Sequence, residues 1–248
     1  MKKKTILITG ATSGIGLSCV KLLVKKENNL ILIARNENKL FKLKEELLQS
    51  HNIKIVTLAS DITDYKKLDK QLNNLDILSE IDVVINNAGL SLESDKLDRT
   101  EIDDIYQMIN TNILGNINIL KICIPFMLKK KTSDIINISS VAGSIQVPNE
   151  SIYSATKAFL SMLSKSLNID YSESGMRISN VSPGAVKTNF ANVRYKGSEE
   201  KAKNTYKGYT PLEADDIANI IGFILEAPRH VNISEITVMP TTQRNFFK

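Results

Sequence analysis

Tyr153 and Lys157 stand four residues apart in the stretch "SIYSATKAFL", residues 151–160. On a helix this spacing places the two side chains on one face. A free phenol has a pKa of about 10, and a nearby ammonium group favours the phenolate. The pair can therefore act as an acid/base couple, although tyrosine and lysine at this spacing are also common as an ordinary surface pair. Other features of the chain have to distinguish the two interpretations.

Three glycines, Gly10, Gly14 and Gly16, follow the apolar run "TILIT" and open a helical segment. Glycines at such a turn let the backbone approach a diphosphate, which then lies at the positive end of the helix. Glycine-rich turns after strands are common, so the motif alone is weak. Its place inside the first strand–helix–strand unit favours a nucleotide-binding site.

The end of the second apolar run indicates which nucleotide. A carboxylate there would bind the ribose hydroxyls of NAD, but the sequence "LIARNE" places Ala34 at that position and Arg35 after it. A guanidinium suits a 2′-phosphate, so NADP is favoured over NAD, with a surface arginine as the alternative. Asp61 follows the third run, where an adenine edge would lie, and could equally cap a helix. The asparagines of "NNAG", Asn86 and Asn87, end the fourth run.

Seven short apolar runs alternate with amphipathic helical segments along the whole chain. The runs cover residues 5–9, 29–34, 53–59, 82–86, 134–139, 177–182 and 235–239. They are continuously apolar, as expected for strands covered on both faces. We therefore predict a single α/β domain over residues 1–248, with a doubly wound parallel sheet of about seven strands, the Rossmann fold. Residues 183–209 break the rhythm, with no expected strand and one short helical stretch, and form a lid or a loop.

Composition excludes several classes of protein. The net charge of +5 comes from lysines that interleave with Glu and Asp on helix-like segments, which indicates solvated faces rather than a nucleic-acid or membrane surface. Cys19 and Cys123 lie in apolar helical patterns, and His51 and His230 are far apart, so we expect no metal site. The opening apolar run is too short for a secretory signal, and no run is long enough to span a membrane. We expect a soluble, cytoplasmic protein.

Five motifs occur in one order, and together they resemble the short-chain dehydrogenase/reductase family. They are TGxxxGIG, NNAG, the asparagine of "TNILG", the serine of "NISSVAG" and YxxxK, spread from residue 5 to residue 188. The resemblance covers essentially the whole chain. It implies an oxidoreductase that uses NADP and a small-molecule substrate, and most often a homotetramer, with the long helices from Thr100 and Ser151 and the tail "MPTTQRNFFK" as contact elements.

The resemblance also assigns roles to residues. Tyr153 would be the general acid/base, and Lys157 would tune it and hold the nicotinamide ribose. Ser140, thirteen residues before Tyr153, is preferred to Ser139 for polarising the substrate carbonyl. Asn112, preferred to Asn110, would hold a water in the proton relay. The implied cofactor-binding residues are Gly10, Thr12, Ser13, Gly14, Ile15, Gly16, Arg35, Asn36, Asp61, Ile62, Asn87, Tyr153, Lys157, Pro183, Gly184, Val186 and Thr188.

Two further stretches, "NFANVRYKG" and "HVNISEITVMPTTQ", are similar to the branch of the family that oxidises 3-hydroxy acids, including serine-type substrates. Arg194 lies between apolar and aromatic residues and is our candidate for the group that binds the acid's carboxylate, with Lys187 second. Asn36 departs from the branch, where a second arginine is expected after Arg35. A 3-oxoacyl or broad-specificity carbonyl reductase, and a non-catalytic NADP-sensing protein, are the alternatives.

Overall fold

The computed structural model describes residues 3–92 and 95–243. Seven strands form one sheet in the order β3-β2-β1-β4-β5-β6-β9, and all neighbouring strands are parallel. The predicted α/β architecture is confirmed, and each predicted apolar run overlaps a strand of this sheet. The sheet strands are β1 (Thr5–Thr9), β2 (Asn29–Ala34), β3 (Ile55–Ala59), β4 (Ile81–Asn86), β5 (Ser133–Ile138), β6 (Met176–Pro183) and β9 (Glu235–Val238).

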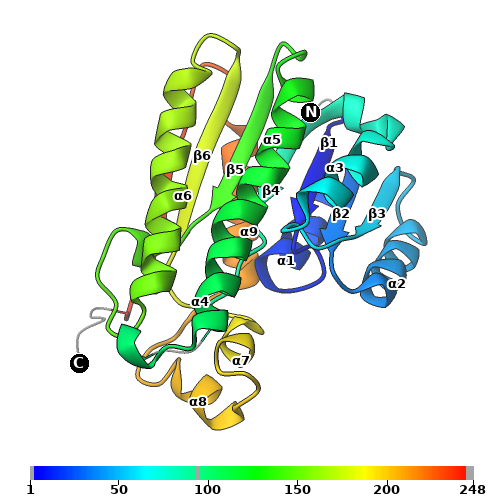
Figure 1. The fold of residues 1–248 in the computed structure, drawn as a ribbon. Helices are drawn as coiled ribbons and strands as arrows, with labels where there is room; N and C mark the ends of the chain where they lie inside the picture. The colour runs from blue at the N-terminus through cyan, green and yellow to red at the C-terminus, as the bar shows by residue number, and fades with distance from the viewer. Residues whose placement is uncertain (1–2, 93–94, 244–248) are drawn as a thin grey trace.

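Helices cover both faces of the sheet (Figure 1). They are α1 (Gly14–Val24), α2 (Glu37–Leu48), α3 (Tyr65–Asn73), α4 (Ile102–Ile109), α5 (Asn116–Met127), α6 (Ser151–Asp170) and α9 (Ala214–Glu226). In β1, Ile6 and Ile8 pack with α1, α2 and α9, whereas Leu7 packs with α3, α5 and α6 on the other face. Successive side chains of a strand alternate between faces, so a strand covered on both must be apolar throughout. Within the described ranges, no helix has both the length and the apolar character needed to cross a membrane.

The strand order reverses between β1 and β4. The chain first builds outwards through β2 and β3 and then returns to the other side of β1. Such a reversal leaves a crevice at the carboxyl ends of the two central strands, which is where these sheets bind ligands. The Thr9 hydroxyl, at the end of β1, accepts hydrogen bonds from the amides of Asn87 and Ala88 at 2.9 and 2.8 Å. These bonds fix the loop after β4 against the end of β1.

The expectation that residues 183–209 contain no strand and a single short helical stretch is wrong in detail. Two short helices, α7 (Phe190–Arg194) and α8 (Glu199–Asn204), form here, and β7 (Val186–Lys187) pairs with β8 (Leu212–Glu213). The partner of β7 lies beyond the segment, so the local pattern does not reveal the pairing. Figure 1 shows α7 and α8 together beyond the ends of the central strands. The last five residues of the tail "MPTTQRNFFK" lie outside the described residues.

A buried carboxylate binds three cations at the amino ends of the strands, opposite the crevice. Asp134 of β5 accepts hydrogen bonds from Arg177 Nε and Arg229 Nη1, both at 2.7 Å, and from Lys4 Nζ at 3.1 Å. Burial by itself would raise the pKa of Asp134. The hydrogen bond from Arg177 and the charges of the three cations outweigh burial and hold that pKa below its ordinary value. The charged side chains therefore join β5, β6 and the segments that precede β1 and β9.

Candidate active site

A cavity of about 540 Å³ lies at the carboxyl edge of the sheet. The segments that follow β1 to β6 all contribute to its wall, so residues far apart in sequence meet there. The predicted site residues that line it are Gly10, Thr12, Ser13, Gly14, Ile15, Arg35, Asp61, Ile62, Asn87, Ser140, Tyr153, Lys157, Pro183, Gly184, Val186, Thr188 and Arg194. Gly16, Asn36 and Asn112 do not line it.

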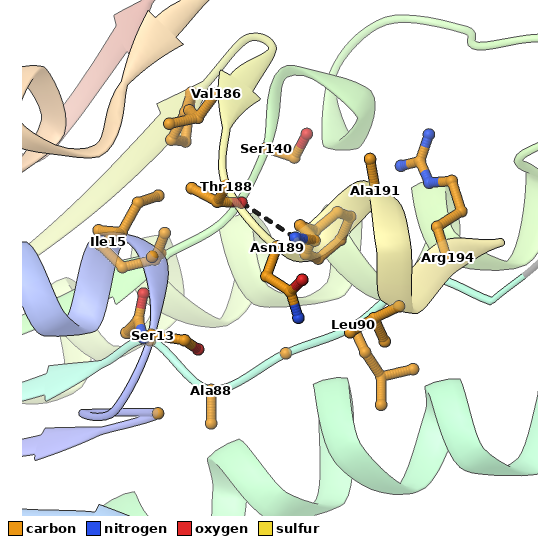
Figure 2. Close-up of a pocket in the computed structure, with 18 of the residues that line it drawn as sticks. Ser13, Ile15, Ala88, Leu90, Ser140, Val186, Thr188, Asn189, Ala191 and Arg194 are labelled. Atoms are coloured by element: carbon orange, nitrogen blue, oxygen red, sulfur yellow. Dashed lines mark hydrogen bonds between the residues drawn. The ribbon is translucent and has the colours of Figure 1, made fainter. Parts of the chain in front are cut away.

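The glycine turn brings the start of α1 against the backbone that precedes it. Gly10 has a φ of +65°, and a Cβ on Gly16 would lie 2.4 Å from the Gly10 carbonyl oxygen. Among the described residues, the Ser13 side chain makes no hydrogen bond that caps α1, so the first amides of the helix remain available as donors. Figure 2 shows Ser13 and Ile15 at this side of the pocket. This backbone arrangement suits a phosphate group.

Arg35 lines the cavity directly after β2, and the residue before it, Ala34, is apolar. Asn36 instead caps α2, because its Oδ1 accepts a hydrogen bond from the Lys39 amide at 2.9 Å. Asp61 is not the cap of α3, which is Asp64. The Asp61 carboxylate accepts hydrogen bonds from the amide and hydroxyl of Thr63 at 2.9 and 2.8 Å and faces the cavity. The guanidinium of Arg35, with apolar Ala34 before it, therefore suits a phosphorylated ribose.

The predicted catalytic tyrosine and lysine lie side by side on α6, both buried. Lys157 Nζ lies 5.8 Å from the centre of the Tyr153 ring and donates a hydrogen bond to the Ile138 carbonyl at 2.9 Å. Ser140 forms a side-chain hydrogen bond with Tyr153. The Ser139 hydroxyl instead donates a hydrogen bond to the Lys157 carbonyl at 2.9 Å. The structure thus brings Ser140, Tyr153 and Lys157 together and explains why Ser140 is the better candidate.

Burial and three neighbouring side chains determine the direction of the Tyr153 pKa shift. Burial raises the pKa of Tyr153, and the groups that oppose this are Arg194, by its charge, and Ser140, by its hydrogen bond. Burial also lowers the pKa of Lys157 to about 8. The ammonium of Lys157 is held at the Ile138 carbonyl, whereas the Arg194 guanidinium carbon lies 5.6 Å from the centre of the Tyr153 ring. The charge of Arg194 favours the phenolate, whereas the charge of Glu150, its ion-pair partner, raises the pKa of Tyr153.

Asn112 lies in a π-helical turn, Asn110–Gly115, between α4 and α5. Its Oδ1 accepts from the Leu90 amide at 2.8 Å, and its Nδ2 donates to the Leu90 carbonyl at 2.7 Å. A Cβ on Gly89 would lie 3.2 Å from Asn112 Oδ1 and 3.3 Å from Lys157 Nζ. Asn112 is therefore close to Lys157, but its side chain is occupied. Its backbone carbonyl accepts a hydrogen bond from Asn116 Nδ2 at 2.9 Å.

Arg194 ends α7 and lies over two aromatic rings. Its guanidinium carbon is 5.4 Å from the centre of the Phe190 ring, in addition to its contact with Tyr153. Its Nη1 donates a hydrogen bond to Glu150 Oε1 at 2.5 Å, and the two side chains are only 13% and 9% exposed. Lys187, the second candidate for the acid-binding group, is exposed and does not line the cavity.

Sequence reasoning did not single out Glu150, although it lines the cavity. Its position three residues before Tyr153 is the signal that could have identified it, because residues at this spacing share a helix face. Tyr206, Tyr209 and Gln243 also line the cavity and were not identified. The Gln243 Oε1 accepts a hydrogen bond from the Ala185 amide at 3.0 Å, a contact between distant parts of the chain that no local pattern predicts.

A family model described as short chain dehydrogenase matches residues 4–199. The chain belongs to the short chain dehydrogenase family. This short chain dehydrogenase is 37% identical over 242 residues to the NADP-dependent 3-hydroxy acid dehydrogenase of Schizosaccharomyces pombe, a match that covers 97% of this chain and 93% of the relative. It is 38% identical to the serine 3-dehydrogenase of Agrobacterium fabrum, and that match covers 96% of this chain and 94% of the relative. Among solved structures, the closed form of a serine dehydrogenase complexed with NADP⁺ matches with a TM-score of 0.91 at 32% identity. The match covers 97% of this chain and 96% of that one.

Proposed function

We propose that this protein transfers a hydride between NADP and a small 3-hydroxy acid of the serine or 3-hydroxypropionate type, or its 3-oxo partner. The chain is an NADP-dependent oxidoreductase of the short chain dehydrogenase family. The observation that carries the substrate class is Arg194, a buried guanidinium beside the ring of Tyr153. The names of the relatives support the same class.

The residues around the cavity fit a phosphorylated dinucleotide. The turn from Gly10 to Gly16 would hold the diphosphate, and Arg35 would bind the 2′-phosphate. Asp61 and Ile62 would lie at the adenine, whereas Pro183, Gly184, Val186 and Thr188 would contact the nicotinamide end. NADP, when bound, supplies or accepts the hydride. The protein orients the two reactants and manages the proton.

Tyr153 would exchange that proton with the 3-oxygen of the substrate. In oxidation its phenolate accepts the hydroxyl proton, and in reduction its phenol returns one. Ser140, which hydrogen-bonds to Tyr153, would hold the same oxygen and polarise a carbonyl. Lys157 would hold the nicotinamide ribose, and the Asn112 carbonyl would order a water that links Lys157 to solvent. These roles remain proposals for the four residues.

Arg194 would bind the substrate's carboxylate. A guanidinium can grip a carboxylate with two parallel hydrogen bonds, which would orient C3 of the acid towards the acid/base residue. The rings of Phe190 and Tyr153 lie against the guanidinium and fix its position. Because the group is largely buried, its attraction for a carboxylate is screened little by solvent.

We further propose that residues 183–209 act as the lid over the substrate. The lid carries Arg194 and meets the body of the protein through Lys196 Nζ, which lies 2.7 Å from Asp104 Oδ2 of α4. The Tyr206 hydroxyl donates to the Val186 carbonyl at 3.0 Å and joins the two ends of the segment. Closure of such a segment would exclude water from the reacting groups.

A substrate panel tests the proposal. Purified protein is supplied with NADP and, separately, with serine, 3-hydroxypropionate and an uncharged alcohol of similar size, and NADPH formation is followed optically. We expect turnover of at least one of the two acids with a higher kcat/KM than the uncharged alcohol. Preference for the uncharged alcohol would refute the 3-hydroxy acid assignment.

One observation favours the alternative, a broad-specificity carbonyl reductase. The charge of Arg194 is already balanced by Glu150, and a neutral ion pair gives no net attraction for an anion. The same panel, run in reverse with NADPH and uncharged ketones, would detect this activity. Faster turnover of the ketones than of 3-oxo acids would establish the alternative.

A further inference from the structure

We propose that Glu150 is a specificity-determining residue, which selects 3-hydroxy acids that carry a 2-amino group over those that do not. The inference rests on the proposed function and refines its substrate class. Glu150 would accept a hydrogen bond from the substrate's ammonium group, while Arg194 binds its carboxylate. The acid-binding end of the cavity would then recognise a zwitterion.

Glu150 is a largely buried part of the cavity wall. It stands at the N-cap of α6, three residues before Tyr153, and lines the same cavity as Ser140 and Lys157. Its side chain is 9% exposed. Among the described residues, its carboxylate does not cap the amides of α6. The helix therefore does not require this carboxylate, and its location points to the cavity.

The ion pair between Arg194 and Glu150 disfavours the binding of a substrate whose only charge is a carboxylate. Arg194 and Glu150 form a close pair, so their charges sum to zero at this point. A monocarboxylate bound to Arg194 would place a second carboxylate near Glu150 in a region screened little by water, which is unfavourable. An ammonium group next to the substrate's carboxylate removes this repulsion. Two negative and two positive charges then alternate in one network.

The geometry of the guanidinium leaves room for a second acceptor. Arg194 binds Glu150 through Nη1, and its Nε is buried without a hydrogen-bond partner among the described residues. An unpaired buried donor is costly, and a carboxylate on the edge formed by Nε and Nη2 would satisfy it. Arg194 can therefore bind the substrate's carboxylate without releasing Glu150.

A neutral substrate would make no use of the pair. Both side chains are nearly buried, and a buried ion pair is expensive to desolvate. An uncharged alcohol offers neither a cation to Glu150 nor an acceptor to Arg194 Nε. A 2-amino-3-hydroxy acid offers both groups: the ammonium on C2, one bond from the C3 that Tyr153 and Ser140 would address, and the carboxylate at C1, two bonds from it.

The test compares serine with 3-hydroxypropionate, which differ by the 2-amino group. In the Glu150→Gln variant the side chain keeps its size and loses its charge. We expect kcat/KM for serine to fall at least about 10-fold, as for the loss of a hydrogen bond to a charged group. We expect KM for 3-hydroxypropionate to fall, because repulsion of its carboxylate is removed. Equal changes for both acids would refute the proposal.

Glu101→Gln is the matched control, because Glu101 also stands at a helix N-cap without capping its helix, here α4, and is exposed outside the cavity. We expect it to leave the ratio of the two kcat/KM values unchanged. A change of ratio as large as that of Glu150→Gln would show a general charge effect and would also refute the proposal.

A measurement on the unaltered protein keeps the proposal testable if the Glu150 variant fails to fold. Alanine and propanoate lack the reacting hydroxyl and differ by the same amino group. We expect alanine to inhibit the wild-type enzyme at lower concentration than propanoate, and equal or weaker inhibition by alanine would overturn the inference. Turnover of 3-hydroxypropionate in preference to serine would refute this inference alone, whereas turnover of neither acid would refute the proposed function.

Discussion

The guanidinium carbon of Arg194 lies 5.6 Å from the centre of the Tyr153 ring. One residue ends the five-residue helix α7 in the proposed lid, and the other belongs to the long helix α6. The charge of Arg194 favours the phenolate over the phenol, and the charge of Glu150 opposes this effect. The residue proposed to bind the substrate's acid group is thus also a charge that tunes the proposed acid/base residue. Loss of Arg194 should therefore alter both substrate affinity and pH dependence.

Arg194→Ala should raise KM for a 3-hydroxy acid and spare an uncharged alcohol of similar size. It should also raise the pKa of Tyr153, because the charge of Arg194 lowers that pKa in the intact site. Oxidation needs the phenolate, so the pH at which kcat/KM rises should move upwards. Steady-state kinetics from pH 6 to pH 11 measure both effects. Equal losses on both substrates would mean that Arg194 shapes the lid without binding the acid, and Arg99→Ala, at an exposed arginine outside the cavity, is the control.

Tyr153→Phe should lower kcat by about 10² or more, since the ring remains and the titrating hydroxyl is lost. Cofactor binding, measured by NADPH fluorescence, should remain largely intact. Tyr171→Phe is the matched control, because Tyr171 follows the same helix and lies outside the cavity. Turnover of Tyr153→Phe close to wild type would make the Tyr153–Lys157 pair a structural feature.

Arg35→Asp should weaken the binding of NADP and shift the cofactor preference towards NAD. The new carboxylate would repel the 2′-phosphate and could accept the ribose hydroxyls. The measurement is kcat/KM with each cofactor, and Lys39→Asp, on α2 but outside the cavity, serves as control. A wild-type enzyme that prefers NAD would contradict the interpretation of Arg35.

Asp134→Asn should destabilise the fold by about 3–5 kcal/mol, because Arg177 and the other cations lose a buried partner. Glu199→Gln, in an exposed ion pair with Lys203, should change stability little. The folded-state pKa of Asp134 is below its ordinary value of 3.8, so its contribution is present above about pH 4 and is lost as the pH falls through the folded pKa. Urea unfolding at pH 7 and pH 3 should show a smaller loss on acidification for the variant. An equal loss would contradict the assignment.

The homotetramer remains a prediction from the family. Exposed apolar residues on α4 and α6, such as Tyr106 and Met162, are consistent with covered faces. Sedimentation at micromolar concentration should give a tetramer for the wild type and smaller species for Met162→Lys. Phe41→Lys on α2 is the control, because Phe41 is 62% exposed and Met162 63%. A wild-type monomer would contradict the prediction.

The sequence predicted the sheet because its central strands are buried on both faces and largely apolar, as in β1, where all five residues are buried. It predicted the position of Tyr153, Lys157 and Ser140 because their spacing is local or part of a motif. It did not predict the pairing of Glu150 with Arg194, 44 residues apart. That contact depends on how the lid packs against α6, which no periodic pattern encodes. The rise in the pKa of Tyr153 was also missed, because burial causes it and the spacing of Tyr153 and Lys157 does not reveal burial.

The packing of α9 against α1 has a consequence for folding during translation. Apolar residues of α1, such as Cys19 and Leu23, share a cluster with Ile217 and Ile221 of α9, and a Cβ on Gly222 would lie 3.1 Å from Leu22. During translation α1 leaves the ribosome early, whereas α9 is among the last elements to follow. At a translation rate of about 5–20 residues per second, α9 is synthesised on the order of ten seconds after α1. The nascent chain therefore exposes an apolar surface that chaperones can bind until synthesis is nearly complete.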